Sequence, residues 1–166
     1  MKILHITTSL AIGGAENILF EVATWQKQVG HEVYVINLRQ EEFFTKKLIE
    51  HGISVFNVLE SEQLAESNLI YLLRLVLKWP LVWFKVKRIA PDTVQTWMYL
   101  ANIYGGLIGR FVRKPVIWGI FSGSTDRKYY SKATFSLIRL SAALSRTIPV
   151  LIVNTLNCKS KGKRLT

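Results

Sequence analysis

Two adjacent glycines, Gly13 and Gly14, lie where an apolar run typical of a β-strand gives way to a helical pattern. The apolar run covers residues 3–6, and Ala15 and Glu16 follow the glycines directly. Glycines let backbone N–H groups approach an anion, and a helix N-terminus adds the positive end of its dipole. The pair could therefore hold a phosphate or a sugar. It could equally do no more than permit a tight turn, and the residues alone leave both interpretations open.

The spacing of the two glycines differs from the dinucleotide-binding fingerprint G-x-G-x-x-G, because the second glycine follows the first directly. A standard dinucleotide site is therefore not supported. Glu16 falls in the first turn of the expected helix, where a carboxylate complements the helix dipole. That structural role is the simpler interpretation, and a contact between Glu16 and a bound substrate is the alternative.

The three histidines are the other side chains with catalytic or metal-binding potential. His5 lies within the first strand-like run and is more typical of a hydrogen-bonded core residue. His31 occupies a turn before the second strand, and His51 lies at a helix end, where a cation suits the dipole. None has a nucleophile or a metal ligand at useful spacing. We therefore expect no metal site and assign no catalytic residue.

Six strand-like runs alternate with helical stretches along the chain. They cover residues 2–7, 32–38, 54–59, 93–97, 116–121 and 150–154. Strands separated by helices predict βαβ units and a mainly parallel sheet. The handedness of such crossovers makes a doubly wound, Rossmann-like α/β fold with helices on both faces the default. The turn after the first strand then lies at the carboxyl edge of the sheet, where these folds bind ligands.

The first helix is the clearest of the helical patterns. Its apolar face is predicted by four residues with helical spacing, Ile18, Val22, Trp25 and Val29. Gly30 is expected to end this helix, and Gly52 a second helix at about residues 43–51.

The composition fits one domain at residues 1–155 with a basic, disordered tail at 156–166. Lysine plus arginine number 22 and aspartate plus glutamate 11 in the 166 residues, so the formal net charge is +11. This excess favours anionic partners such as phosphate groups, nucleic acid or an acidic membrane surface. The basic residues are scattered over many elements and accompany no known nucleic-acid-binding motif, so we expect no nucleic-acid partner.

The first ten residues do not form a secretory signal, because their short apolar run is broken by polar residues. A single cysteine, Cys158, cannot form an internal disulfide, which indicates a reducing compartment. We therefore expect a cytoplasmic protein. The most apolar segment, residues 68–89, carries five basic residues and Pro80, which argues against a membrane span. It is either an amphipathic helix on the core or an interfacial helix at the inner face of a membrane, with tryptophans beside its lysines.

Four segments, taken in order, resemble the amino-terminal half of glycosyltransferase family 4. They are LHITTSLAIGGAE at 4–16, GHEVYVINL at 30–38, PDTVQTWMYLANIYGGLIGR at 91–110, and SKATFSLIRLSAALSR at 131–146, which precedes a strand and Asn154. The resemblance covers about residues 2–154. The ordered set is more specific than the glycine pair by itself.

The resemblance implies a GT-B enzyme, in which two Rossmann-like domains face each other across a cleft. The amino-terminal domain binds mainly the acceptor and the other domain binds the sugar nucleotide. Transfer retains the anomeric configuration and needs no metal or other cofactor. The glycine turn lies at the floor of the cleft in such enzymes, near the donor phosphates and sugar. The candidate substrate-binding residues are then Gly13, Gly14, Glu16, Trp97, Tyr99, Asn102 and Ser122. Ser122 opens a polar loop at 122–132 that could contact an acceptor hydroxyl or could simply be solvated.

The sequence departs from the family pattern at two positions, and no stretch of it matches the family's donor domain. Many relatives carry a histidine where this chain has Leu100, and often an arginine where it has Phe121, which puts acceptor handling in doubt. The donor domain of the family contains two glutamates separated by seven residues. Glu42 and Glu50 have that separation, but they lie on the second predicted helix, in the wrong domain, and we regard the match as accidental.

The sequence thus predicts the acceptor-binding half of a retaining glycosyltransferase of cell-surface polysaccharide or glycolipid synthesis. Its expected partners are a nucleotide sugar, a saccharide or lipid-linked acceptor, and a carboxy-terminal donor domain on a separate chain. The alternative is a non-catalytic Rossmann-like module, or a truncated remnant, that binds phosphate or an anionic membrane surface.

Overall fold

The computed structural model describes residues 1–39, 43–59, 68–120, 136, 139–140 and 150–154 of the chain. Several of the sequence predictions fall outside these residues: the candidate site residue Ser122 with its polar loop at 122–132, Glu42, most of the segment at 131–146, and the tail at 156–166. Phe121, which replaces an arginine of the family pattern, also lies outside them.

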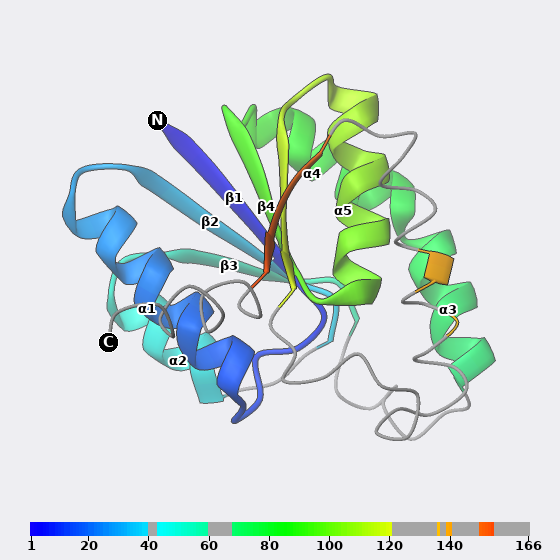
Figure 1. The fold of residues 1–166 in the computed structure, drawn as a ribbon, viewed down its shortest axis with the longest axis horizontal. Coiled ribbons are helices and arrows are strands. Elements are labelled where there is room, and N and C mark those ends of the chain that lie inside the picture. The colour runs from blue at the N-terminus through cyan, green and yellow to red at the C-terminus, as the bar shows by residue number, and fades with distance from the viewer. Residues whose placement is uncertain (40–42, 60–67, 121–135, 137–138, 141–149, 155–166) are drawn as a thin grey trace, which may run out of the picture.

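Six strands form one sheet in the order β3-β2-β1-β4-β5-β6, and every neighbouring pair is parallel (Figure 1). Their bounds are Lys2–Thr7 for β1, Glu32–Asn37 for β2, Ser54–Asn57 for β3, Thr93–Trp97 for β4, Val116–Ile120 for β5 and Val150–Asn154 for β6. The predicted Rossmann-like α/β fold is confirmed. Each predicted strand is present, and β2 and β3 end one and two residues earlier than expected.

The helices cover both faces of the sheet. On one face lie α1 (Gly14–Gln28) and α2 (Phe43–Glu50), and on the other lie α3 (Asn68–Leu77), α4 (Trp79–Ile89) and α5 (Tyr99–Val112) (Figure 1). Each face has its own apolar core. Leu19 of α1 and Leu48 of α2 pack with Val35 of β2, whereas Val86 of α4 and Ile108 of α5 pack on the opposite face.

The apolar stripe predicted for α1 faces the sheet only in part: Val22 packs against the core. Trp25 is 60% exposed and Val29 is 49% exposed, whereas Leu19, Ala23 and Gln26 form the buried side. The reason is that the buried side includes a glutamine, which enters the core because it has hydrogen-bond partners there. A periodicity built on apolar residues cannot register such a position. The prediction of the apolar face was therefore wrong for Trp25 and Val29, whereas the helix and its end at Gly30 (φ +90°) are confirmed.

The apolar segment at 68–89 forms two helices, and the second begins just before Pro80. Proline is tolerated in the first turn of a helix, where its missing N–H has no intrahelical partner to lose. Tyr71 and Leu75 of α3 and Val82 of α4 pack against the sheet, so this segment does cover the core. In the described part of the chain, we find no helix with the length and apolar character that a membrane crossing requires.

Candidate functional site

At the carboxyl edge of the sheet, the connections that follow β1 and β4 run to opposite faces. These strands are neighbours, but the helix after β1 lies on one face and the helix after β4 lies on the other. The chain therefore diverges at this edge, and ligands of doubly wound folds bind in the crevice at such a point. The two turns that border it are the β1–α1 turn, which ends in Gly13, and the β4–α5 turn at Met98.

The β1–α1 turn is held by its own polar groups and by the core. The hydroxyl of Thr7 donates to the carbonyl oxygen of Ser9 at 3.0 Å, and the backbone N–H of Ala11 donates to Ser9 Oγ at 3.1 Å. Leu10 is fully buried, and its carbonyl oxygen accepts the N–H of Phe44 at 3.1 Å. The turn is thus anchored to α2, and the glycine pair follows a hydrogen-bonded loop.

Gly13 and Gly14 differ in what surrounds them. Gly13 is the N-cap of α1, and its carbonyl oxygen accepts the first helical bond, from the N–H of Asn17 at 3.0 Å. The carboxylate of Glu16 folds back over it, so that a Cβ at position 13 would overlap Glu16 Oε2. Nothing lies within 4 Å of a Cβ placed on Gly14, which faces open space. The Glu16 carboxylate thus covers Gly13, whereas Gly14 is left open.

The position of Glu16 decides what chemistry the turn can perform. A carboxylate at the helix N-terminus satisfies the positive end of the dipole and repels a phosphate that approaches the same place. It accepts hydrogen bonds from hydroxyl groups, which a sugar supplies in number. The geometry of the turn, with Glu16 over Gly13, therefore suits a sugar better than a phosphate.

The β4–α5 turn contains a strained residue. Met98 has φ +70° and ψ 171°, a region populated almost only by glycine, so its backbone is held against a cost of about 1–3 kcal/mol. Its N–H donates to the carbonyl oxygen of Gly119 at 3.0 Å, and its carbonyl oxygen accepts the N–H of Asn102 at 2.8 Å. These bonds from a neighbouring strand and from α5 maintain the conformation. Strain of this kind gathers at functional sites, and nothing in the sequence pattern indicated it.

Asn102, a predicted substrate-binding residue, is fully buried and braces this turn. Its amide lies 2.7 Å from Thr96 Oγ1, and with the nitrogen on that side it also donates to the Met98 carbonyl oxygen at 3.0 Å. This orientation leaves the Thr96 hydroxyl free to donate to the carbonyl oxygen of Ile117 at 3.4 Å. Asn102 therefore supports the site from beneath, and its side chain does not reach solvent in this structure.

A chain of buried hydrogen bonds joins Trp97 to α1. Trp97 Nε1 donates to His5 Nδ1 at 2.9 Å, and His5 Nε2 then donates to Gln26 Oε1 at 2.7 Å. Gln26 Nε2 donates onward to Gln95 Oε1 at 3.3 Å. His5 is fully buried, and this burial lowers its pKa to about 4, which outweighs the opposing effect of the bond to Gln26. A neutral ring with one donor and one acceptor fits the two bonds, so the expectation of a satisfied core histidine is confirmed.

The predicted site residues thus divide into two groups. Gly13, Gly14 and Glu16 lie at the surface of the edge, whereas Trp97 and Tyr99 are each 5% exposed. The sequence reasoning missed Gln26, Gln95 and Met98. For Gln26, the one available signal was a polar residue on the side of α1 that also carries Leu19 and Ala23.

Leu100 and the histidines give no further chemistry at this edge. Leu100 is partly buried and packs against the apolar core. Among the residues described, no cluster of three or more histidine, cysteine or acidic side chains could hold a metal ion. Of the two glutamates with the family's spacing, Glu50 ends α2 and Glu42 lies outside the described residues.

No protein-family profile matches the sequence, and no curated protein matches it either. Several solved structures match by fold. HepE from Anabaena, in complex with UDP and glucose, aligns with a TM-score of 0.65 and 19% identity over 92% of this chain and 37% of that protein. MurG from Acinetobacter baumannii aligns with a TM-score of 0.62 and 17% identity over 92% of this chain and 40% of that protein. A glycosyltransferase from Rickettsia africae aligns with a TM-score of 0.54 and 13% identity, over 92% of this chain and 42% of that protein.

These similar structures are GT-B glycosyltransferases, and HepE is also seen in complex with UDP and with UDP-glucose. At identities below 20%, the similarity concerns the fold. The chain spans 37% to 42% of the length of the three proteins, which is less than half of each. The sheet described above therefore corresponds to one part of a GT-B structure.

Proposed function

We propose that this chain is the amino-terminal, acceptor-binding half of a retaining glycosyltransferase of family 4. The supporting observation is the alignment of nearly the whole chain with 37% of HepE, a protein that binds UDP and glucose. The glycine turn supports the proposal independently, because it lies where doubly wound folds bind ligands. The substrates are a sugar nucleotide and a saccharide or lipid-linked acceptor, in the synthesis of a cell-surface polysaccharide or glycolipid.

Each half of such an enzyme contributes a different part of the reaction. We assign the sugar nucleotide to a carboxy-terminal domain, either on a separate chain or in the remainder of a longer protein. This chain supplies the opposite wall, where Gly14 allows close approach and Glu16 accepts sugar hydroxyl bonds. Holding two reactants in the productive orientation supplies much of the rate of such a transfer. One wall alone cannot provide that orientation.

The first test follows from this division of roles. The purified 166-residue chain, incubated with UDP-glucose and saccharide acceptors, is expected to release no UDP above the uncatalysed rate. In the same samples, backbone amide NMR should show weak, saturable shifts at Gly13 and Gly14. Gly14→Ala should abolish these shifts, because its methyl group enters the open space above the turn. Efficient turnover by the chain alone, or shifts confined to other surfaces, would contradict the proposal.

A non-catalytic binding module is the alternative, and Leu100 is the observation that favours it. Leucine cannot exchange a proton, and this side chain packs into the core at the position where many relatives have a histidine. The test is Leu100→His in a version of the chain joined to a donor domain. A gain of transfer activity assigns the missing group to this position, and unchanged activity shows that the position does not limit catalysis.

We further propose that the chain contacts the inner face of a membrane through α3 and α4, which also places it in the cytoplasm. Seven large apolar side chains of these helices are at least 39% exposed: Ile70, Leu72, Leu73, Val76, Leu77, Leu81 and Phe84. Basic residues flank them, among them Lys78, Lys85, Lys87 and Arg88. Apolar side chains beside cations are typical of interfacial helices on anionic membranes. The tryptophans contribute less than the sequence indicated, because Trp79 packs against the core.

Vesicle sedimentation tests this contact. The chain is expected to sediment with phosphatidylglycerol vesicles at low salt and to stay in solution with neutral vesicles. Leu77→Glu/Phe84→Glu should weaken sedimentation by at least tenfold, since burial of each apolar side chain is worth about 1.5–3 kcal/mol. The matched control is Trp25→Glu/Val29→Glu, which places the same charges on the exposed face of α1. Equal weakening in both variants would show that charge alone, and not this surface, governs binding.

A further inference from the structure

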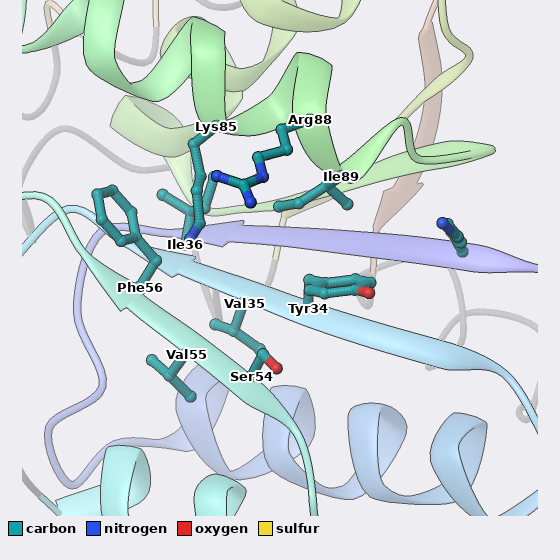
Figure 2. Close-up of a pocket in the computed structure, with 10 residues that line it drawn as sticks. Tyr34, Val35, Ile36, Ser54, Val55, Phe56, Lys85, Arg88 and Ile89 are labelled. Carbon is teal, nitrogen blue, oxygen red and sulfur yellow. The ribbon is translucent and has the colours of Figure 1, made fainter.

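A cavity of about 270 Å³ lies between α4 and the strands β2 and β3 (Figure 2). Its lining includes Lys2 at the start of β1 and Ser54 at the start of β3. None of its residues belongs to the β1–α1 or the β4–α5 turn. The cavity is therefore separate from the carboxyl-edge site.

The charge of this cavity is strongly positive. Lys2, Lys85 and Arg88 all line it, and Figure 2 shows Lys85 and Arg88 extending from α4 towards the strands. Lys2 lies 3.8 Å from the carboxylate of Glu32. Among the residues that the structure describes, neither Lys85 nor Arg88 forms an ion pair with a carboxylate. Two cations thus converge on one space without an anion between them.

The remaining lining supplies an apolar wall. Tyr34 and Ser54 also line the cavity, and the Tyr34 hydroxyl donates to Glu32 Oε2 at 3.2 Å. The ring of Phe56 closes one side, with Lys85 Nζ 5.1 Å from its centroid. An anion with several acceptor oxygens and a short carbon chain would match this lining, because its oxygens face the cations and its carbons face the ring.

We propose that this cavity binds a phosphate group, as a monoester or a diester. The planar guanidinium of Arg88 can donate two parallel hydrogen bonds to a phosphate, and Lys85 adds a point charge. The volume holds a phosphate with a few attached atoms and is smaller than most sites for drug-sized ligands. A soluble phosphate ester and the headgroup of an anionic lipid share this chemistry. The proposal does not depend on the glycosyltransferase assignment, because no carboxyl-edge residue takes part.

The test is a titration of the full 166-residue chain with inorganic phosphate and with glycerol 3-phosphate, followed by backbone amide NMR. Saturable shifts are expected at Ser54, Phe56 and Arg88. Lys85→Gln/Arg88→Gln should raise the Kd for glycerol 3-phosphate by at least about tenfold, because two charge-assisted hydrogen bonds are lost. The matched control is Lys78→Gln/Lys87→Gln, which removes the same charge from α4 and its N-cap without touching the cavity. Its Kd should change by less than about twofold.

Vesicles of phosphatidylglycerol distinguish the two sources of phosphate. If the soluble esters bind with the expected variant sensitivity, the ligand is a free phosphate ester. If only vesicles bind, and the Lys85/Arg88 variant weakens their binding several-fold more than the Lys78/Lys87 control does, the ligand is a lipid headgroup. Equal weakening in the control variant, or no binding by any of the three probes, would overturn the proposal. The substituted side chains are exposed, so circular dichroism should confirm unchanged folding.

Discussion

Gly105→Ala is expected to lower the free energy of unfolding by about 1–3 kcal/mol, the usual cost of overpacking a core. A Cβ at position 105 would overlap Thr96 Cγ2 and would lie 3.1 Å from Ile6 Cδ1. Thr96 cannot turn away without breaking its hydroxyl bonds to Asn102 and to the carbonyl oxygen of Ile117. Ile6 is fully buried, so it has little room to move. The close approach of α5 to β1 and β4 therefore requires glycine here.

The direction of this effect is opposite to helix propensity. Alanine in a helix interior is favoured over glycine by about 0.5–1 kcal/mol, so propensity alone predicts stabilisation by Gly105→Ala. Urea unfolding followed by tryptophan fluorescence measures the difference. Gly14→Ala is the matched control, because its added Cβ meets no atom within 4 Å, and it should stabilise the chain by about 0.4–1 kcal/mol. A Gly105→Ala variant as stable as this control would show that α5 can move away from the sheet.

The sequence predicted the layers of the fold and the glycine turn better than it predicted contacts. Strand runs such as residues 116–120 are almost continuously apolar, because both faces of a parallel sheet are buried. This apolar pattern can be recognised without knowing which strands pair with each other. The side of α1 that faces the sheet depends on the hydrogen bond between Gln26 and His5, which lies 21 residues earlier in the chain. The periodicity of one helix does not include such a partner.

The location of the candidate site could be predicted from the sequence, but the roles of its residues could be predicted only in part. Gly13 and Gly14 are visible because a strand-to-helix turn is a local feature. The buried positions of Trp97 and Asn102 could not be predicted from family resemblance, which assigns roles without geometry. The strain at Met98 depends on Gly119, which lies on a neighbouring strand. Features that arise between strands are therefore those that the sequence alone does not reveal.

The chain is expected to lose about 2 kcal/mol of stability between pH 7.5 and pH 5 through His5 alone. Burial lowers the pKa of His5 to about 4 from its ordinary 6.5. Between these two values the unfolded chain binds a proton at this ring and the folded chain does not. The stabilisation is therefore complete above pH 6.5 and is lost progressively as the pH falls towards 4. A protonated ring would also present a second N–H to the indole N–H of Trp97, which cannot accept it.

Urea unfolding at pH 7.5 and pH 5 measures this loss directly. His5→Gln is expected to be less stable than the natural chain at pH 7.5, but its difference between the two pH values should be smaller by about 2 kcal/mol. His31→Gln, which changes a histidine in the turn before β2, serves as the control and should retain the difference seen in the natural chain. Near pH 4, tryptophan fluorescence should also report release of Trp97 from the His5 ring wherever the chain is still folded, since the bond between them requires a neutral acceptor. An equal pH dependence in all three proteins would mean that other groups govern acid stability and that the chain from Trp97 to Gln95 survives protonation of its central ring.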